Sequence, residues 1–202
     1  MEECDLCKRE NESSRILLET KNFYVMPTLG QIIEGYLVIC TKEHYIGLSH
    51  LPEKLLEELE DLKEKCKEVL GKVYTSPLFF EHGSITECNK AGACIDHAHL
   101  HVVPFETDIF EDIAKNFKPR KISNLKEVRI QNERQVPYLY YENQKGDKYV
   151  FEINSIIPSQ YLRQVISSKT KEPFKWDWRT YPQEELVKKS VEKLKPLFKK
   201  FY

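Results

Sequence analysis

Short apolar runs separated by polar turns mark the first half of the chain. Residues 22–28 (NFYVMPT) and 35–40 (GYLVIC) are rich in β-branched and aromatic residues, with a turn-like segment between them. Such runs predict two β-strands. Residues 77–83 (PLFFEHG) and 95–104 (IDHAHLHVVP) predict two more strands, joined by a loop that contains Gly and Asn.

Residues 51–71 have the periodicity of a helix. Pro52 stands at a plausible first helical position, and Gly71 is where the helix is expected to stop. The segment carries one apolar stripe, made of Leu55, Leu59, Leu62, Cys66 and Val69. The order strand, strand, helix, strand, strand predicts an antiparallel sheet with a long helix packed on one face.

The second half of the chain has a different pattern. Residues 108–117 favour a helix, and the basic, polar residues 118–129 indicate a connector. Residues 136–143 and 148–154 flank QKGD as in a β-hairpin, and helices are expected from Pro158 and from about Pro182. We therefore expect an α+β protein with a core domain over residues 1–120 and a C-terminal α+β extension over residues 121–202, packed on that core.

Charge and composition narrow the class of protein. Lys and Arg number 31 against 32 Asp and Glu, so the net charge of -1 does not favour a polyanionic partner. No apolar run is long enough to cross a bilayer, and the acidic N-terminus resembles neither a signal nor a transit peptide. We expect a cytoplasmic protein that does not contact membranes. Its six cysteines are then free thiols or metal ligands, with Cys40 and Cys66 in the core.

Three of the six histidines lie in five residues: His97, His99 and His101. Side chains alternate along a strand, so these imidazoles should form a row on one face, about 6 to 7 Å apart. Neutral imidazole offers a lone pair for metal binding or for nucleophilic catalysis. The alternative is a polar face that contains histidines by chance.

A second motif lies at the N-terminus, where Cys4 and Cys7 are two residues apart. This spacing lets both thiolates reach one zinc ion, which then needs two further ligands. A redox-active pair is the main alternative.

Together these motifs resemble the histidine triad (HIT) superfamily of nucleotide-binding proteins. HAHLHVV is similar to its His-x-His-x-His signature, and residues 34–51 (EGYLVICTKEHYIGLSHL) are similar to the segment before its long helix. The resemblance covers roughly residues 1 to 110 and implies a HIT-like fold. In zinc-containing relatives the matching positions hold a structural zinc ion, here Cys4, Cys7, His44 and His97. His50 is the nearest rival ligand.

The resemblance also implies an enzyme. His99 matches the nucleophile, which would attack an α-phosphate and form a covalent nucleotidyl-histidine, while His101 would donate hydrogen bonds to phosphoryl oxygens. The activity implied is that of a nucleotide hydrolase or nucleotidyltransferase. A role for His99 as a metal ligand, in a catalytic zinc hydrolase, remains an alternative.

One departure from the family concerns phosphate and leaving-group contacts. Many relatives have Gln followed by Ser or Thr before the triad, where this chain has Ala93 and Cys94. The loop with Asn89 and Gly92 is expected to compensate through backbone amides. Glu81 and His82 stand beside this loop, either in the same pocket or as structural hydrogen bonders.

The last third resembles, in pieces, the extension of CwfJ-like RNA-processing proteins. That likeness implies a substrate cleft shaped with Gln160, Arg163 and Arg179, whereas we favour Trp176 and Trp178 as packing anchors and the arginines as surface ion pairs. It also implies a second function, that of a non-catalytic nucleotide- or RNA-binding accessory factor. The expected partners are a nucleotide or dinucleotide, with RNA and a homodimer as further options.

Overall fold

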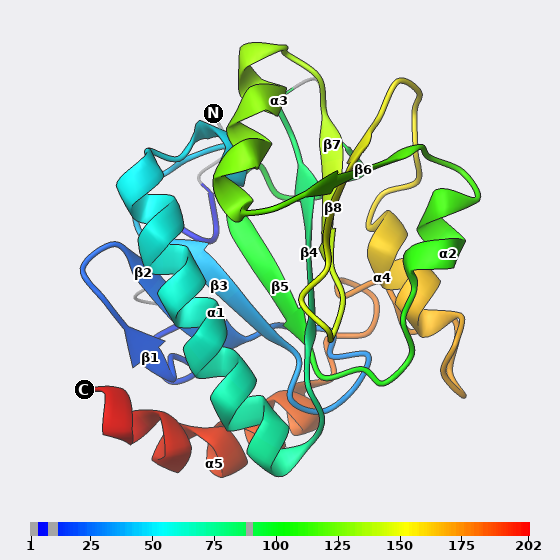
Figure 1. The fold of residues 1–202 in the computed structure, drawn as a ribbon. Helices are drawn as coiled ribbons and strands as arrows, with labels where there is room; N and C mark the ends of the chain where they lie inside the picture. The colour runs from blue at the N-terminus through cyan, green and yellow to red at the C-terminus, as the bar shows by residue number, and fades with distance from the viewer. Residues whose placement is uncertain (1–3, 8–11, 88–90) are drawn as a thin grey trace.

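One antiparallel sheet of eight strands organises the protein (Figure 1). The computed structural model describes residues 4–7, 12–87 and 91–202. The strand order is β1-β2-β3-β5-β4-β7-β8-β6, and each neighbouring pair is antiparallel. The strands are β1 (Leu18–Glu19), β2 (Phe23–Pro27), β3 (Leu37–Thr41), β4 (Leu78–Gly83), β5 (His99–Val103), β6 (Pro119–Ile122), β7 (Tyr138–Glu142) and β8 (Lys148–Glu152).

The four strands predicted in the first half are confirmed. β2 pairs with β3 from Phe23↔Thr41 to Pro27↔Leu37. β5 lies between β3 and β4, so the histidine strand is central in the sheet. All residues of β2, β3 and β4 are buried, which is why β2, β3 and the first three residues of β4 are mostly apolar or aromatic rather than alternating.

The long helix α1 (Glu53–Val73) is confirmed, with two corrections at its ends. Pro52 is the N-cap residue rather than the first helical residue. The helix continues past Gly71, where a Cβ would meet no atom within 4 Å, and the N–H of Tyr74 donates to Leu70 O. Glycine lowers helix propensity but does not end a helix that is already packed along its length.

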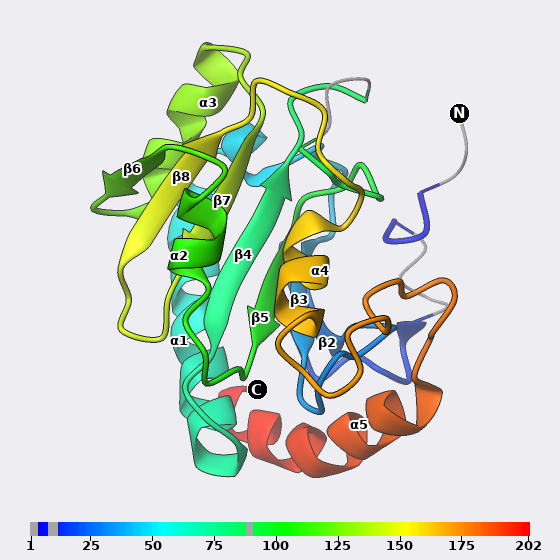
Figure 2. The same ribbon diagram turned by 90° about the vertical axis from the view of Figure 1, so that its right-hand side faces the viewer.

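Helices cover both faces of the sheet (Figures 1 and 2). α1 and α5 (Glu184–Phe198) pack on one face, in a core that includes Leu59, Phe79 and Phe198. α2 (Phe110–Ala114) and α4 (Tyr161–Ser167) cover the other face, in a core that includes Phe80 and Leu162. The helices expected after Pro158 and Pro182 therefore exist. No helix in residues 4–7, 12–87 and 91–202 combines the length and apolarity of a membrane span.

The basic stretch 118–129 is not a connector, which corrects the sequence analysis. It forms the edge strand β6, a short 3₁₀ segment η3 (Leu125–Val128) and the start of α3 (Arg129–Glu133). Ile122, Leu125 and Val128 are buried while the charged residues between them face outward. A few apolar residues are enough to form β6, because an edge strand buries less of its surface than a central strand.

The sheet runs across the boundary expected near residue 120. The predicted hairpin forms as β7 and β8, and β7 pairs with β4 from Phe79↔Glu142 to Gly83↔Tyr138. The buried Lys63 of α1 forms an ion pair of 2.5 Å with the buried Glu142 of β7. The extension thus continues the sheet of the first half, and the division into two domains stays a prediction.

Shorter 3₁₀ segments complete the chain. They are η2 (Leu48–His50), between β3 and α1, and η4 (Lys199–Phe201), after α5.

Candidate active site and metal centre

The three histidines do not share one regular strand. β5 begins at His99, and His97 lies in a bend two residues earlier. The Ala98 N–H donates to Tyr45 O (2.6 Å), and Ala98 O accepts the N–H of Thr41 (3.2 Å). This bend separates the surroundings of His97 from those of His99 and His101.

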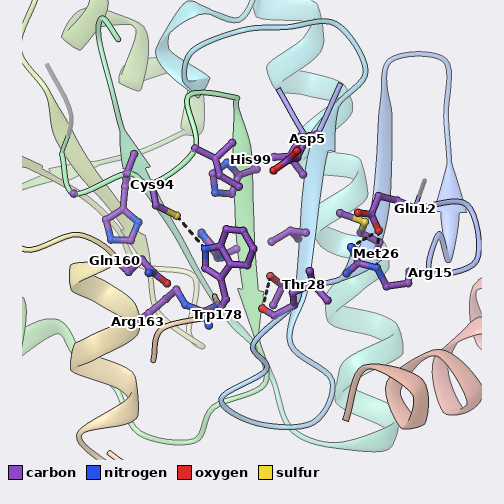
Figure 3. Close-up of a pocket in the computed structure, with 18 residues that line it drawn as sticks. Asp5, Glu12, Arg15, Met26, Thr28, Cys94, His99, Gln160, Arg163 and Trp178 are labelled. Carbon is purple, nitrogen blue, oxygen red and sulfur yellow. Dashed lines mark hydrogen bonds and ion pairs between the residues drawn. The ribbon is translucent and has the colours of Figure 1, made fainter. Parts of the chain in front are cut away.

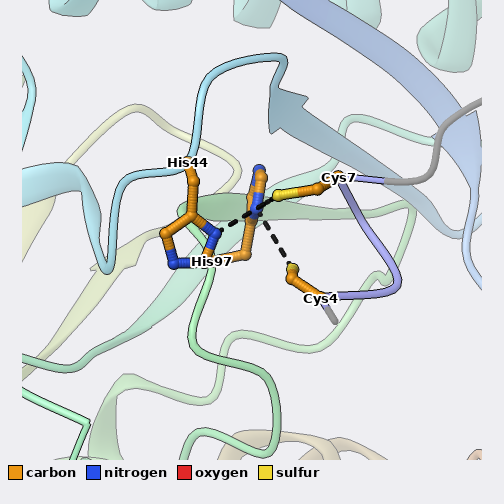
Figure 4. Close-up of side chains that lie close together, drawn as sticks. All are labelled: Cys4, Cys7, His44 and His97. Carbon is orange, nitrogen blue, oxygen red and sulfur yellow. Dashed lines mark hydrogen bonds between the residues drawn. The ribbon is translucent and has the colours of Figure 1, made fainter. Parts of the chain in front are cut away.

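His97 belongs to a cluster of thiols and imidazoles (Figure 4). One donor atom from each of Cys4, Cys7, His44 and His97 lies within 4.8 Å of the others. Sγ of Cys4 and of Cys7 are 3.4 and 3.5 Å from His97 Nδ1, and Cys7 Sγ is 3.3 Å from His44 Nδ1. Two sulfur and two nitrogen donors are the set that tetrahedral zinc prefers.

Hydrogen bonds prepare His97 to offer Nδ1 to a cation. Its Nε2 lies 2.8 Å from the carbonyl oxygen of Thr41, so Nε2 carries the proton and Nδ1 has the free lone pair. Burial lowers the pKa of His97 to about 4, which keeps this ring neutral. Burial and the neighbouring Cys4 raise the pKa of the Cys7 thiol to about 11, and a metal cation would reverse that effect.

His50 is not part of this cluster. Its Nε2 lies 3.1 Å from the carbonyl oxygen of Ile85, so it has a structural partner of its own. The rival ligand considered from the sequence is therefore excluded from this group of donors.

His99 has the opposite arrangement of its ring nitrogens. Its Nδ1 donates to the carbonyl oxygen of His97 over 2.5 Å. Nε2 is therefore the unprotonated nitrogen of the ring. Burial lowers the pKa of His99 below its usual value, and so it favours the neutral form.

His101 is held by two aromatic residues. Its Nδ1 lies 2.9 Å from the hydroxyl of Tyr36, and its ring stacks on Phe80 with 4.3 Å between centroids. The rings of His99 and His101 are 4.8 Å apart in an edge-to-face arrangement. Burial raises the pKa of Tyr36 to about 12, so its hydroxyl stays protonated and can donate to His101.

Glu81 and His82 are neighbours on β4 that face opposite sides of the sheet. His82 lines the same pocket as His99, and its Nε2 accepts the N–H of Leu162 over 3.1 Å. Burial lowers the pKa of His82 to about 3. Glu81 lies on the α1 side, where it accepts from Leu48 N–H and the Tyr138 hydroxyl. His82 thus combines both roles considered from the sequence, whereas Glu81 is structural.

The pocket beside the triad has an empty volume of about 930 Å³, including open solvent at its mouth. Figure 3 shows His99 and Trp178 between two ends. One end contains Met26, with Glu12 and Arg15 hydrogen-bonded to each other. Leu6, Val38 and Ile95 make this end largely apolar. An elongated pocket with an apolar end and convergent polar groups fits a small ligand with one flat, apolar part.

The other end of the pocket comes largely from the C-terminal extension. Gln160 and Arg163 line it, and between the two ends Trp178 Nε1 donates to Cys94 Sγ over 3.3 Å. Arg163 is 2% exposed, which corrects its interpretation as a surface ion-pairing residue. Arg179 is exposed and lies over the Trp178 ring at 4.8 Å.

The loop before the triad lies partly in the pocket wall. Gly92, Ala93 and Cys94 line it, and Gly92 has φ of +72°, where its missing Cβ avoids a 2.7 Å contact with Pro158 O. Asn89, the other expected phosphate contact, lies outside the described residues. Gly92 O accepts the N–H of Gln160 over 2.7 Å, which ties this loop to the extension.

Sequence reasoning missed Tyr36, Arg15 and Glu12 as site residues. Tyr36 sits inside an apolar run that predicts a strand, and nothing local separates it from a core tyrosine. Arg15 and Glu12 lie in a polar segment whose position over the pocket depends on the N-terminal chain path.

The first half of the chain is similar to a known protein family. Residues 9–108 match the family model described as HIT domain. Among curated proteins, none matches the chain. The match ends at residue 108, so the likeness of the extension to CwfJ-like proteins stays a prediction.

Solved structures of similar proteins carry related descriptions. A HIT family hydrolase from Clostridium thermocellum is 18% identical, with a TM-score of 0.41, and the match covers 51% of this chain and 90% of that one. A histidine triad nucleotide-binding protein from Sulfolobus tokodaii is 22% identical, with a TM-score of 0.44 and coverage of 64% and 87%. A Zn-bound histidine triad family protein from Mycobacterium smegmatis is 15% identical, with a TM-score of 0.44 and coverage of 65% and 94%. The first half of this chain, over residues 9–108, is therefore similar to the HIT domain.

Proposed function

We propose that the protein is a nucleotide hydrolase or nucleotidyltransferase that acts at the α-phosphate through His99. The observation that carries the proposal is the 2.5 Å hydrogen bond from His99 Nδ1 to His97 O. It leaves Nε2 with a free lone pair on a residue that lines the pocket.

The reaction proceeds in two displacements. Nε2 of His99 forms an N–P bond with the α-phosphorus while the bond from phosphorus to the leaving group breaks, and the leaving group takes up a proton from solvent. Water or another acceptor then forms a new bond to phosphorus and gives up a proton to solvent, while the N–P bond breaks to regenerate neutral imidazole. His101, oriented by Tyr36 at 2.9 Å, donates from Nε2 to a phosphoryl oxygen as charge develops.

We also propose that Cys4, Cys7, His44 and His97 hold a structural zinc ion. A bound cation there would neutralise the two thiolates and cross-link the N-terminal segment to the bend before β5. His97 is both a donor to this cluster and the carbonyl partner of His99. The cluster thereby supports the position of the nucleophile without taking part in the reaction.

The test is product release from dinucleoside polyphosphates and nucleoside phosphoramidates by wild type and His99→Ala. His50→Ala is the matched control, because His50 is a histidine of the same chain outside the pocket. We expect turnover by wild type and the control but not by His99→Ala, and a reaction quenched with SDS at alkaline pH should contain nucleotide bound to protein, because the N–P bond of a nucleotidyl-histidine is labile in acid. Equal inertness of wild type and His99→Ala across the panel would rule out catalysis. Nucleotide binding without turnover would then favour the accessory-factor function.

A further inference from the structure

Two buried polar side chains of the extension lie in the pocket wall. Gln160 and Arg163 are 3% and 2% exposed, and both line the same pocket as His99 (Figure 3). Both lie beyond residue 108, where the HIT match ends. Neither has a role in the reaction described above.

The orientation of the Gln160 amide follows from its partner. Nε2 lies 3.1 Å from Asp177 Oδ1, and because a carboxylate only accepts, the nitrogen must face it. Asp177 is held in turn by the Thr180 hydroxyl (2.7 Å) and the Arg179 N–H (3.1 Å). The hydrogen bond from Thr180 lowers the pKa of Asp177, which therefore stays an ionised acceptor.

This arrangement leaves Gln160 Oε1 as an acceptor. Oε1 is buried and has no hydrogen-bond donor in the part of the chain that the structure describes. Buried polar atoms are rarely left unpaired, because they lose water without gaining a partner. A ligand group with an N–H or O–H would satisfy this oxygen.

Arg163 is a buried cation without an anionic partner. Its Nε donates to Trp176 O over 2.9 Å, and its Nη2 donates to Gly30 O over 2.5 Å. Both acceptors are neutral carbonyls, and no ion pair between described residues includes Arg163. A buried charge is unfavourable unless an opposite charge accompanies it, so an anion in the pocket would stabilise this side chain.

The charge lies close to the triad. The guanidinium carbon is 5.2 Å from the centroid of the Tyr36 ring, and the Tyr36 hydroxyl contacts His101. Arg163 is therefore separated from the proposed phosphoryl site by one aromatic ring and one imidazole.

We propose that Gln160 and Arg163 form a substrate subsite supplied by the extension. Arg163 balances the negative charge of the phosphoryl group, and Gln160 Oε1 accepts a hydrogen from the first atom of the leaving group. The subsite rests on the proposed function and defines its preference: a leaving group with an N–H or O–H is bound better than one that presents only acceptors.

The charge of Arg163 is tested by binding of AMP and adenosine to the full chain, measured by calorimetry. Arg163→Gln keeps hydrogen-bond donors toward Gly30 and Trp176 but removes the charge, and Arg163→Lys keeps the charge. We expect Arg163→Gln to weaken AMP binding roughly tenfold to a hundredfold, with adenosine unchanged, and Arg163→Lys to retain most of the difference. Equal losses for both ligands, or none, would overturn this role. If Arg163→Gln does not fold, the wild-type protein still tests this role. Equal dissociation constants for AMP and adenosine would overturn it.

The acceptor is tested with adenosine 5′-phosphoramidate and adenosine 5′-phosphorofluoridate. Their leaving atoms are similar in size, but NH₂ has hydrogens to donate and fluorine has none. We compare the ratio of kcat/KM for the two substrates in wild type and in Gln160→Met, so that their intrinsic reactivities cancel. The preference for the phosphoramidate should fall about tenfold in Gln160→Met, and partly in Asp177→Asn, which no longer fixes the amide. An unchanged ratio overturns the role of Gln160 while leaving the proposed function intact.

Binding separates failure of the subsite from failure of the reaction. The proposed function fails only if wild type is inert across the whole panel described above. If wild type turns over neither of these two analogues, their dissociation constants are compared instead. A tenfold shift of their ratio in Gln160→Met supports the subsite as a binding site, and no shift overturns it.

Discussion

His97 and His99 carry the same side chain and are two positions apart in the chain, but their surroundings differ. His97 faces two thiols and a second imidazole, whereas His99 faces the pocket and His101. In each case one ring nitrogen is bonded to a backbone carbonyl, but it is Nε2 in His97 and Nδ1 in His99. The chemistry open to each histidine therefore depends on which nitrogen the backbone occupies.

The two clusters also differ in how charge is compensated. The thiol cluster gathers groups that become anionic when they bind a metal cation. The pocket gathers neutral rings beside the buried cation of Arg163, an arrangement suited to an anionic ligand. Histidines at alternate positions in this chain therefore belong to separate sites, and the charged groups nearest to each one differ.

Replacing each histidine in turn tests most directly whether His97 and His99 belong to separate sites. His99→Ala should lower turnover by a factor of about 10³ or more and leave the zinc content near one equivalent. His97→Ala should lose the zinc. Metal analysis and kinetics on both variants check this, and loss of zinc from His99→Ala would merge the two clusters into a single metal site.

Removing the metal from wild type is expected to have the next largest effect. Loss of a cross-link between the N-terminal segment and the bend before β5 should cost about 3 kcal/mol, or roughly 6–12 °C in Tm for a chain of this size. Thermal unfolding with and without a chelator measures it. Cys40→Ala is the matched control, since Cys40 is a buried cysteine outside the cluster, and its variant should respond to the chelator as wild type does.

Glu81 is a buried carboxyl on the α1 side of the sheet, opposite the pocket. Its titration tests whether burial alone determines the protonation state of a buried group in this protein. Burial raises the pKa of Glu81 to about 7. A folded-state pKa above the unfolded value means that the folded state binds the proton more tightly. Stability is therefore highest below about pH 4.5 as far as this group is concerned, and it falls as the pH rises to about 7.

The expected loss of unfolding free energy from this carboxyl is roughly 3 kcal/mol across that range. Denaturant titrations from pH 5 to 8 on wild type and Glu81→Gln measure it. The variant keeps a hydrogen-bonding group beside Leu48 and Tyr138 and should show a flatter profile. Parallel profiles for the two proteins would show that the carboxyl stays ionised in spite of its burial.

The smallest expected effect concerns the hydrogen bond that orients His101. Tyr36→Phe removes the hydroxyl 2.9 Å from His101 Nδ1 and should lower kcat/KM about fivefold to tenfold, because one neutral hydrogen bond is lost. Tyr141→Phe is the control, since its hydroxyl contacts Asp108 away from the pocket. An equal loss in both variants would point to general destabilisation.

The local patterns that predicted most of the fold are those with many buried positions. β2, β3 and β4 are buried at every residue, and α1 buries a continuous stripe, so the sequence shows three short apolar runs and one helical periodicity. The edge strand β6 buries only Ile122 among its four residues, and its charged side chains resembled a connector. The extent of α1 beyond Gly71 depended on packing, which a propensity rule does not contain.

The residues with the relevant chemistry can be identified from the amino-acid sequence: two cysteines at metal-binding spacing, and histidines at alternate positions beside an apolar run. How these residues are grouped depends on the fold. The bend at His97 brings this residue to the thiols, and the pairing of β7 with β4 adds the extension to the sheet, where helix α4 of the extension brings Arg163 and the N-cap residue Gln160 to the pocket. The reason is physical: side-chain types and spacings are local properties, whereas the partner of each ring nitrogen and the charge beside it come from segments that are distant in the chain.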